Sequence, residues 1–150
     1  SIILSSYNDL IGKYTIIAVF LTMLIGTGGN AGNQSATVVI RGLTTREISR
    51  RNAYKVFLRE VNIGILMSLV LGLVAFIRVY SSCHEAISAL IISFSLFLIV
   101  VTSMALGALI PIMLERFDMD PAHSAAPFLA TLMDVLGVLI YCFVCSKLLG

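Results

Sequence analysis

The residue with the clearest chemical potential is Asp134, a lone carboxylate inside a long apolar segment. The sequence from Pro127 to Cys145 contains no other charged residue. If this segment crosses a bilayer as a helix, which takes about 20 residues, Asp134 lies near the middle. A charge there costs at least ~2.5 kcal/mol, so such a residue is kept where it faces water, a cation or a partner. Asp134 is therefore the leading candidate functional residue. The alternative is a structural Asp that is protonated or hydrogen-bonded within a helix bundle.

Several polar residues interrupt another apolar segment, in the stretch GTGGNAGNQSATVVI from Gly26 to Ile40. Its amides and hydroxyls have the spacing i, i+3, i+4, i+7, which places them on one face of a helix. They are Asn30, Asn33, Gln34 and Thr37. Glycines in the same stretch allow close backbone approach and can interrupt a helix. We expect this polar face to line a path at membrane depth, the alternative being a polar seam that joins helices.

Composition sets the class of protein. The chain has 150 residues, of which 59% are hydrophobic and 12% are charged, about half the charge of a typical soluble domain. This indicates an integral membrane protein. The net charge of +2 does not indicate a nucleic-acid partner. The basic residues cluster in one loop, as is typical of the cytosolic side of a membrane protein. Because the three cysteines are an odd number, they do not indicate a disulfide framework. Cys142 and Cys145 are predicted to be small packing residues, and Cys83 beside His84 is too little for a zinc site.

The apolar segments predict an all-α, polytopic bundle with four spanning helices. We expect the spans at about 15–40, 60–80, 86–114 and 124–147, with a polar connection at 8–14. In the second span Gly64, Ser68 and Gly72 predict a helix-packing stripe. The chain begins at Ser1 without a charged n-region, so we interpret it as a fragment that starts within an earlier hydrophobic segment.

The loop from Arg41 to Arg59 sets the expected orientation in the cell membrane. It holds six of the ten basic residues, and cytosolic loops are enriched in such residues. The loops 41–59 and 115–121 are therefore predicted to be cytosolic and the C-terminus external. Thr44 or Thr45 is a candidate N-cap for the next helix. Asp120, from the acidic loop, and Glu60 form a candidate cation site at the cytosolic mouth, the alternative being solvated loop charges.

Three stretches together resemble the membrane domain of the MgtE magnesium channels and transporters, and the resemblance covers essentially all of residues 1–150. They are Gly26–Leu43, Pro111–Ala122 and Pro127–Tyr141. The resemblance implies a homodimer of five-helix subunits, with the pore at the dimer axis. It also implies cytosolic regulatory modules that precede the membrane part, which this chain lacks together with most of the first membrane helix.

The resemblance assigns roles to residues as well. Asp134 would bind a hydrated Mg²⁺, helped by backbone carbonyls near Ala130, and Asn30 and Asn33 would belong to the same metal site. Further pore-lining positions would be Gly26, Gln34, Thr37 and Thr131. The glycines at 28, 29 and 32 would allow close backbone approach near the axis.

The chemistry of the residues agrees with this assignment. Mg²⁺ retains its water and prefers one or two carboxylates in an octahedral shell, and a dimer would supply two copies of Asp134. No His/Cys set favours zinc or copper. The predicted function is Mg²⁺ transport, and the alternative is a carrier or exchanger for another divalent cation such as Mn²⁺ or Co²⁺. An enzyme is not expected, because an aspartyl hydrolase needs two close carboxylates. A purely structural subunit would need no polar stripe.

Overall fold

The part of the chain that the structure describes is a bundle of four long helices. The computed structural model describes the backbone of residues 2–49 and 51–149, and the side chains of this part outside 2–18, 83, 124 and 149. The helices are α1 (Ile2–Thr44), α2 (Ala53–Cys83), α3 (Ala86–Arg116) and α4 (Pro121–Leu149). Within the described residues all regular structure is helical, which confirms the predicted all-α class.

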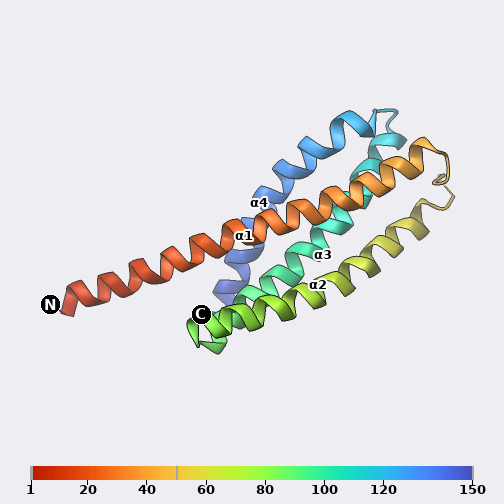
Figure 1. The fold of residues 1–150 in the computed structure, drawn as a ribbon. Helices are drawn as coiled ribbons and strands as arrows, with labels where there is room; N and C mark the ends of the chain where they lie inside the picture. Colours follow the sequence, from red (N-terminus) through yellow and green to blue (C-terminus); the bar gives the residue numbers. More distant parts are fainter. Residues whose placement is uncertain (1, 50, 150) are drawn as a thin grey trace.

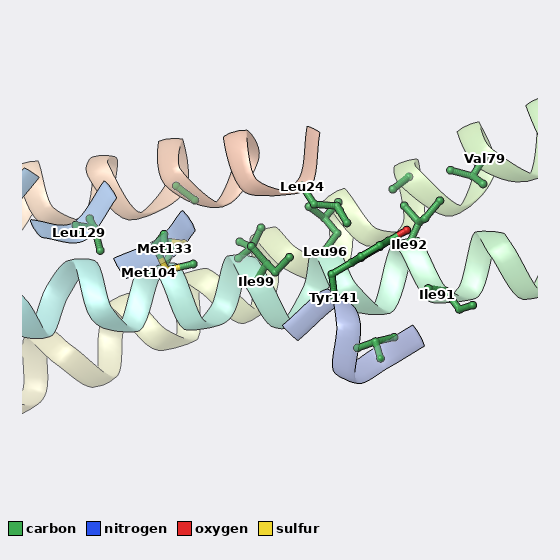
Figure 2. Packing of buried hydrophobic residues seen from close by; sticks show 14 of the residues in the cluster. Leu24, Val79, Ile91, Ile92, Leu96, Ile99, Met104, Leu129, Met133 and Tyr141 are labelled. Atoms are coloured by element: carbon green, nitrogen blue, oxygen red, sulfur yellow. The ribbon is translucent and has the colours of Figure 1, made fainter. Parts of the chain in front are cut away.

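Helix α3 lies at the centre of the bundle. It packs against α1, α2 and α4, and α1 also packs against α4 (Figure 1). Side chains from all four helices form the apolar core shown in Figure 2, including Leu24 of α1, Val79 of α2, Ile99 of α3 and Met133 of α4. The N-terminal part of α1 extends past the other helices (Figure 1).

Small residues bring α1 and α3 into close contact. A Cβ atom added to Gly107 of α3 would collide with the backbone of Gly32 on α1. The Ser103 hydroxyl of α3 donates to the Gly28 carbonyl. Gly28 and Gly32 therefore serve a contact within the chain. Close approach of residues 28, 29 and 32 near a dimer axis stays a prediction. A Cβ on Gly29 would meet nothing within 4 Å in the single chain.

The small residues of α2 also pack as predicted. Gly64 lies against Met104 of α3, and Ser68 is fully buried. A Cβ on Gly72 would lie 3.4 Å from the Ser93 carbonyl oxygen of α3. The opposite face of α2 exposes a row of large apolar side chains: Leu66, Leu69, Val70, Leu73, Val74 and Ile77. An apolar surface of this extent suits lipid.

Three helical segments of the described part are long and apolar enough to cross a membrane. They are Ala53–Ser82, Ala86–Arg116 and Ala125–Leu148. They contain the second and third predicted spans and all but the first residue of the fourth. The first predicted span lies within α1, which does not belong to this set.

Several predicted boundaries are wrong. The expected connection at 8–14 is helical, and the glycines after residue 25 do not interrupt α1. A glycine inside a helix costs only about 1 kcal/mol, and α1 contains no proline to break it. The predicted 41–59 loop is also shorter, because α1 ends at Thr44 and α2 begins at Ala53.

The predicted N-cap at Thr44 or Thr45 is wrong as well. Thr44 lies in the last turn of α1, where its hydroxyl donates to the Ile40 carbonyl at 2.9 Å. The N-cap residue of α2 is Asn52, whose side chain makes no capping bond. The Asn52 amide instead donates to the Glu47 carbonyl at 2.8 Å and accepts from the Ser49 amide at 2.6 Å. It thereby closes the connection between the two helices.

Candidate functional site

The contact between α1 and α4 sets the depth of the candidate residues. Gly137 lies beside Ile25, Met133 beside Gly28, and Leu129 beside Gly32. Position numbers rise along one helix as they fall along the other, so the two helices are antiparallel. Residues 130–134 of α4 therefore lie at the same depth as residues 28–32 of α1.

Burial on α4 separates an inner face from an outer face. Leu129 and Met133 are each 1% exposed and belong to the core. Ala130, Thr131 and Asp134 are exposed on the outer face. The Thr131 hydroxyl donates to the Pro127 carbonyl of its own helix at 3.0 Å. No hydrogen bond or ion pair reaches Asp134 from the described side chains. The structural alternative, an Asp held by a partner inside its own bundle, is therefore not supported.

The polar face predicted on α1 is also exposed. Asn30, Asn33, Gln34 and Thr37 are all exposed, and the residues between them, such as Ala31 and Ala36, are buried. The Thr37 hydroxyl donates to the Asn33 carbonyl at 2.8 Å, within the helix. Among the described residues, the three amide side chains have no hydrogen-bond partner. Inside a single chain this face does not join helices.

Gly26 extends the same open surface. It is exposed, and a Cβ added to it would meet nothing within 4 Å. We call this exposed surface of α1 and α4 the polar face. It comprises Gly26, Asn30, Asn33, Gln34, Thr37, Ala130, Thr131 and Asp134. Because Asp134 lies on an apolar spanning-type helix, leaving it against lipid would be costly. The polar face therefore needs water, a cation or a second protein surface against it.

The ligands on this face are oxygens. Asp134 supplies a carboxylate, and the asparagines and glutamine supply amide oxygens. The described part of the chain contains no group of three or more His, Cys, Asp or Glu side chains that could hold a metal ion. A site with one carboxylate per chain suits a cation that keeps most of its water, as Mg²⁺ does.

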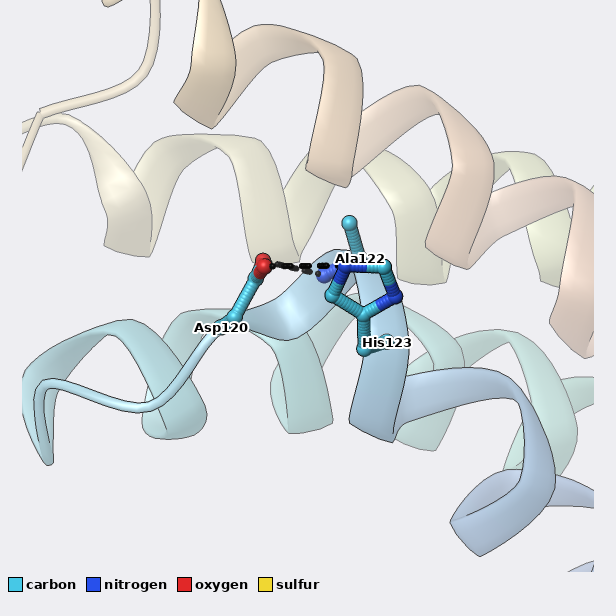
Figure 3. Close-up of polar contacts among 3 residues, drawn as sticks. All are labelled: Asp120, Ala122 and His123. Carbon is cyan, nitrogen blue, oxygen red and sulfur yellow. Dashed lines mark hydrogen bonds and ion pairs between the residues drawn. The ribbon is translucent and has the colours of Figure 1, made fainter.

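Asp120, predicted at the cytosolic mouth, caps a helix. Its Oδ1 accepts from the Ala122 backbone amide at 3.0 Å, and its Oδ2 lies 3.5 Å from His123 Nε2 (Figure 3). Pro121 follows as the first residue of α4. Aspartate before a proline at the helix start is a favourable N-terminus, because the side chain satisfies a free amide and proline needs none.

Glu60, the other member of that predicted site, is buried at 4% exposure. Its Oε2 accepts from the Ser35 hydroxyl at 3.0 Å. No hydrogen bond or ion pair joins Glu60 to Asp120 among the described residues, and a shared cation site remains a prediction. Sequence reasoning missed Ser35. Ser35 is not one of the positions 30, 33, 34 and 37 that share the polar side of α1. This could have indicated that Ser35 points toward the inner face of the helix.

A bundle of apolar helices with an exposed, oxygen-rich polar face defines a class of helical membrane proteins suited to a hard cation. Residues 21–144 match the family model MgtE, described as a divalent cation transporter. The chain belongs to the MgtE family, as the sequence motifs predicted. Its relatives are named as transporters, which agrees with the prediction that the chain is not an enzyme.

Three relatives are named magnesium transporter MgtE. The protein from Thermus thermophilus is 40% identical over 149 residues, which is 99% of this chain and 33% of the relative. Those from Enterococcus faecalis and Bacillus subtilis are 33% and 32% identical over 139 residues, which is 93% of this chain and 31% of each relative. The chain thus spans about a third of the length of these relatives.

Proposed function

We propose that this chain is the membrane part of a magnesium transporter, and that Mg²⁺ crosses along the polar face with Asp134 as the principal ligand. One observation carries the proposal: Asp134 is exposed and unpaired among the described residues, at the same depth as the exposed α1 amides. The relatives named as magnesium transporters support the choice of ion.

The arrangement favours binding without trapping. A hydrated Mg²⁺ needs few direct protein ligands, so Asp134 can attract the ion while Asn30, Asn33 and the carbonyl near Ala130 hold its water by hydrogen bonds. Binding strong enough for entry and weak enough for exit is what conduction requires. Gln34, Thr37, Thr131 and Gly26 then line the path on either side.

We further infer that two copies of the chain face each other across the polar face, with the pore at the dimer axis. Two copies of Asp134 would balance one divalent ion, and the second copy would remove the polar face from lipid. In this homodimer residues 1–150 of each copy would contribute four spans, of which α1 provides the first. Light scattering of the active protein should give twice the mass of one chain, and a monomer that retains transport would contradict the dimer.

A carrier or exchanger for Mn²⁺ or Co²⁺ is the second candidate, because oxygen ligands also serve these ions. The test is Mg²⁺ uptake into proteoliposomes by the full-length protein, with each ion as competitor. We expect Asp134→Asn to reduce Mg²⁺ uptake by roughly tenfold or more, since ~1.4 kcal/mol of lost attraction is tenfold in affinity. Asp118→Asn is the matched control, because Asp118 is an exposed carboxylate outside the helices.

Full uptake by Asp134→Asn would contradict the role of Asp134. Uptake of Mn²⁺ or Co²⁺ that Mg²⁺ does not compete with would favour the second candidate.

A further inference from the structure

A buried polar junction joins three helices directly behind the polar face. Ser35 of α1 is 1% exposed and Glu60 of α2 is 4% exposed. The Ser35 hydroxyl lies 3.0 Å from Glu60 Oε2 and 3.2 Å from the Met104 carbonyl oxygen of α3. Because a hydroxyl carries one hydrogen, it is shared between these two acceptors. Ser35 therefore ties α1 to both α2 and α3.

Glu60 depends on this contact. Among the residues with described side chains, none forms an ion pair with Glu60. The Glu60 side chain accepts a hydrogen bond from the hydroxyl of Ser35 on α1. A buried polar group that loses its partner is strongly unfavourable, the more so when it is charged. Glu60 thus holds Ser35 at a fixed position, and α1 with it.

The position of Ser35 determines what the contact controls. Ser35 directly follows Gln34 and lies two residues after Asn33 on the same continuous helix. One residue corresponds to about 100° around a helix of 3.6 residues per turn. Holding Ser35 against α2 and α3 therefore fixes the direction in which Asn33 and Gln34 point.

The other close contacts of α1 hold it against α3. The Ser103 hydroxyl donates to the Gly28 carbonyl, Gly32 approaches Gly107, and Ser35 itself donates to the Met104 carbonyl. The Ser35–Glu60 bond instead joins α1 to α2. Because hydrogen bonds are directional, it adds a restraint on the rotation of α1 from a second helix.

We propose that Glu60 is a positioning residue for magnesium transport, which acts through Ser35 to aim the α1 amides into the ion path. This inference rests on the proposed function of the polar face. In this role Glu60 does not contact the ion at the polar face, because its side chain is buried among α1, α2 and α3 whereas the polar face is exposed.

The test is the Mg²⁺ concentration that gives half-maximal uptake by the full-length protein in proteoliposomes. Ser35→Ala removes the donor, and Glu60→Met removes the acceptor at similar side-chain length. We expect each to raise this concentration about threefold or more, as loss of a typical intramolecular hydrogen bond would. The double variant should be no worse than the more affected single variant, since both remove the same bond. Glu60→Gln keeps an acceptor oxygen and should stay within about twofold of the wild type.

The matched control is Ser68→Ala. Ser68 is also fully buried, but its hydroxyl donates to the Ile65 carbonyl of its own helix at 2.8 Å. It should leave the half-maximal concentration unchanged. A thermal melt of each variant runs beside the uptake assay. If Ser35→Ala lowers the melting temperature but not the apparent affinity, or if the two single effects add, the positioning role is wrong.

Asp134→Asn in the same series separates this inference from the proposed function. If that variant transports Mg²⁺ like the wild type, the polar face is not the ion path and the proposed function fails. If it loses transport while Ser35→Ala keeps normal affinity, only the role of Glu60 fails.

Discussion

The chemistry of Asp134 depends on its having no partner within the described part of its own chain. An ion pair or hydrogen bond would stabilise the fold through the carboxylate, and substitution would then weaken the protein. An exposed carboxylate on an apolar helix has the opposite consequence, because its charge is a cost until a cation or water offsets it.

The thermal stability of Asp134→Asn should therefore hold or rise in the absence of Mg²⁺. Asparagine keeps the shape and one oxygen while it removes the charge. The gain in melting temperature on adding Mg²⁺ should shrink, because a ligand stabilises a protein in proportion to how well it binds the folded state. Melts with and without Mg²⁺ measure both quantities. A lower melting temperature without Mg²⁺, together with an unchanged Mg²⁺ effect, would assign Asp134 a structural role.

Single residues were predictable from the sequence where their chemistry conflicts with their surroundings. Asp134 is recognisable because it is a charged residue in an apolar segment. Asn30 and Asn33 are recognisable because they are amides in another apolar segment. Glu60 and Asp120 were grouped at one mouth because both lie near predicted helix ends. Their actual contacts, with Ser35 and with the start of α4, depend on helix rotation and exact helix ends, which composition does not reveal.

At the scale of elements, the α1–α3 contact holds the polar face in place. Gly107 faces the backbone of Gly32, so an added methyl group has no space, whereas a Cβ on Gly29 meets nothing within 4 Å. Two glycines with the same helical conformation thus have opposite surroundings.

Gly107→Ala should destabilise the protein by about 1–3 kcal/mol, the usual cost of overpacking a close contact. Gly29→Ala should be neutral or stabilising by up to about 1 kcal/mol, because alanine is the better helix former. Melting temperatures of the two variants provide the comparison. Equal losses at both positions would contradict the described packing of α1 on α3.

The helices themselves were largely predictable, since long apolar segments bounded by charged loops indicate membrane helices. Their ends were not. The polar residues at 8–14 and the basic residues after Arg41 suggested loops, but helical hydrogen bonding continues through polar residues when no proline intervenes. The glycines of α1 were expected at a dimer axis, and which of them face α3 depends on helix rotation.

At the scale of the whole molecule, basic residues mark one end of the bundle. Arg41, Arg46, Arg51, Lys55 and Arg59 are exposed near the α1–α2 connection, which is the distribution expected of a cytosolic end. Orientation in the cell membrane therefore remains a prediction with a direct test.

In a protein whose three cysteines are replaced by serine, Arg46→Cys should react with a membrane-impermeant thiol reagent only after cells are permeabilised. Ser82→Cys, at the opposite end of α2, should react in intact cells. The reverse pattern would invert the proposed topology.

The central claim, that the polar face is a water-filled path for Mg²⁺, is tested most directly by thiol accessibility in the same cysteine-free protein. Asn30 of the polar face and Leu69 of α2 are both exposed in the single chain, Leu69 at 56%. In proteoliposomes, Asn30→Cys should react with a charged thiol reagent much faster than Leu69→Cys, because only position 30 would face water. Mg²⁺ should slow the reaction at position 30 alone. Equal rates at the two positions, or no protection by Mg²⁺, would contradict the account.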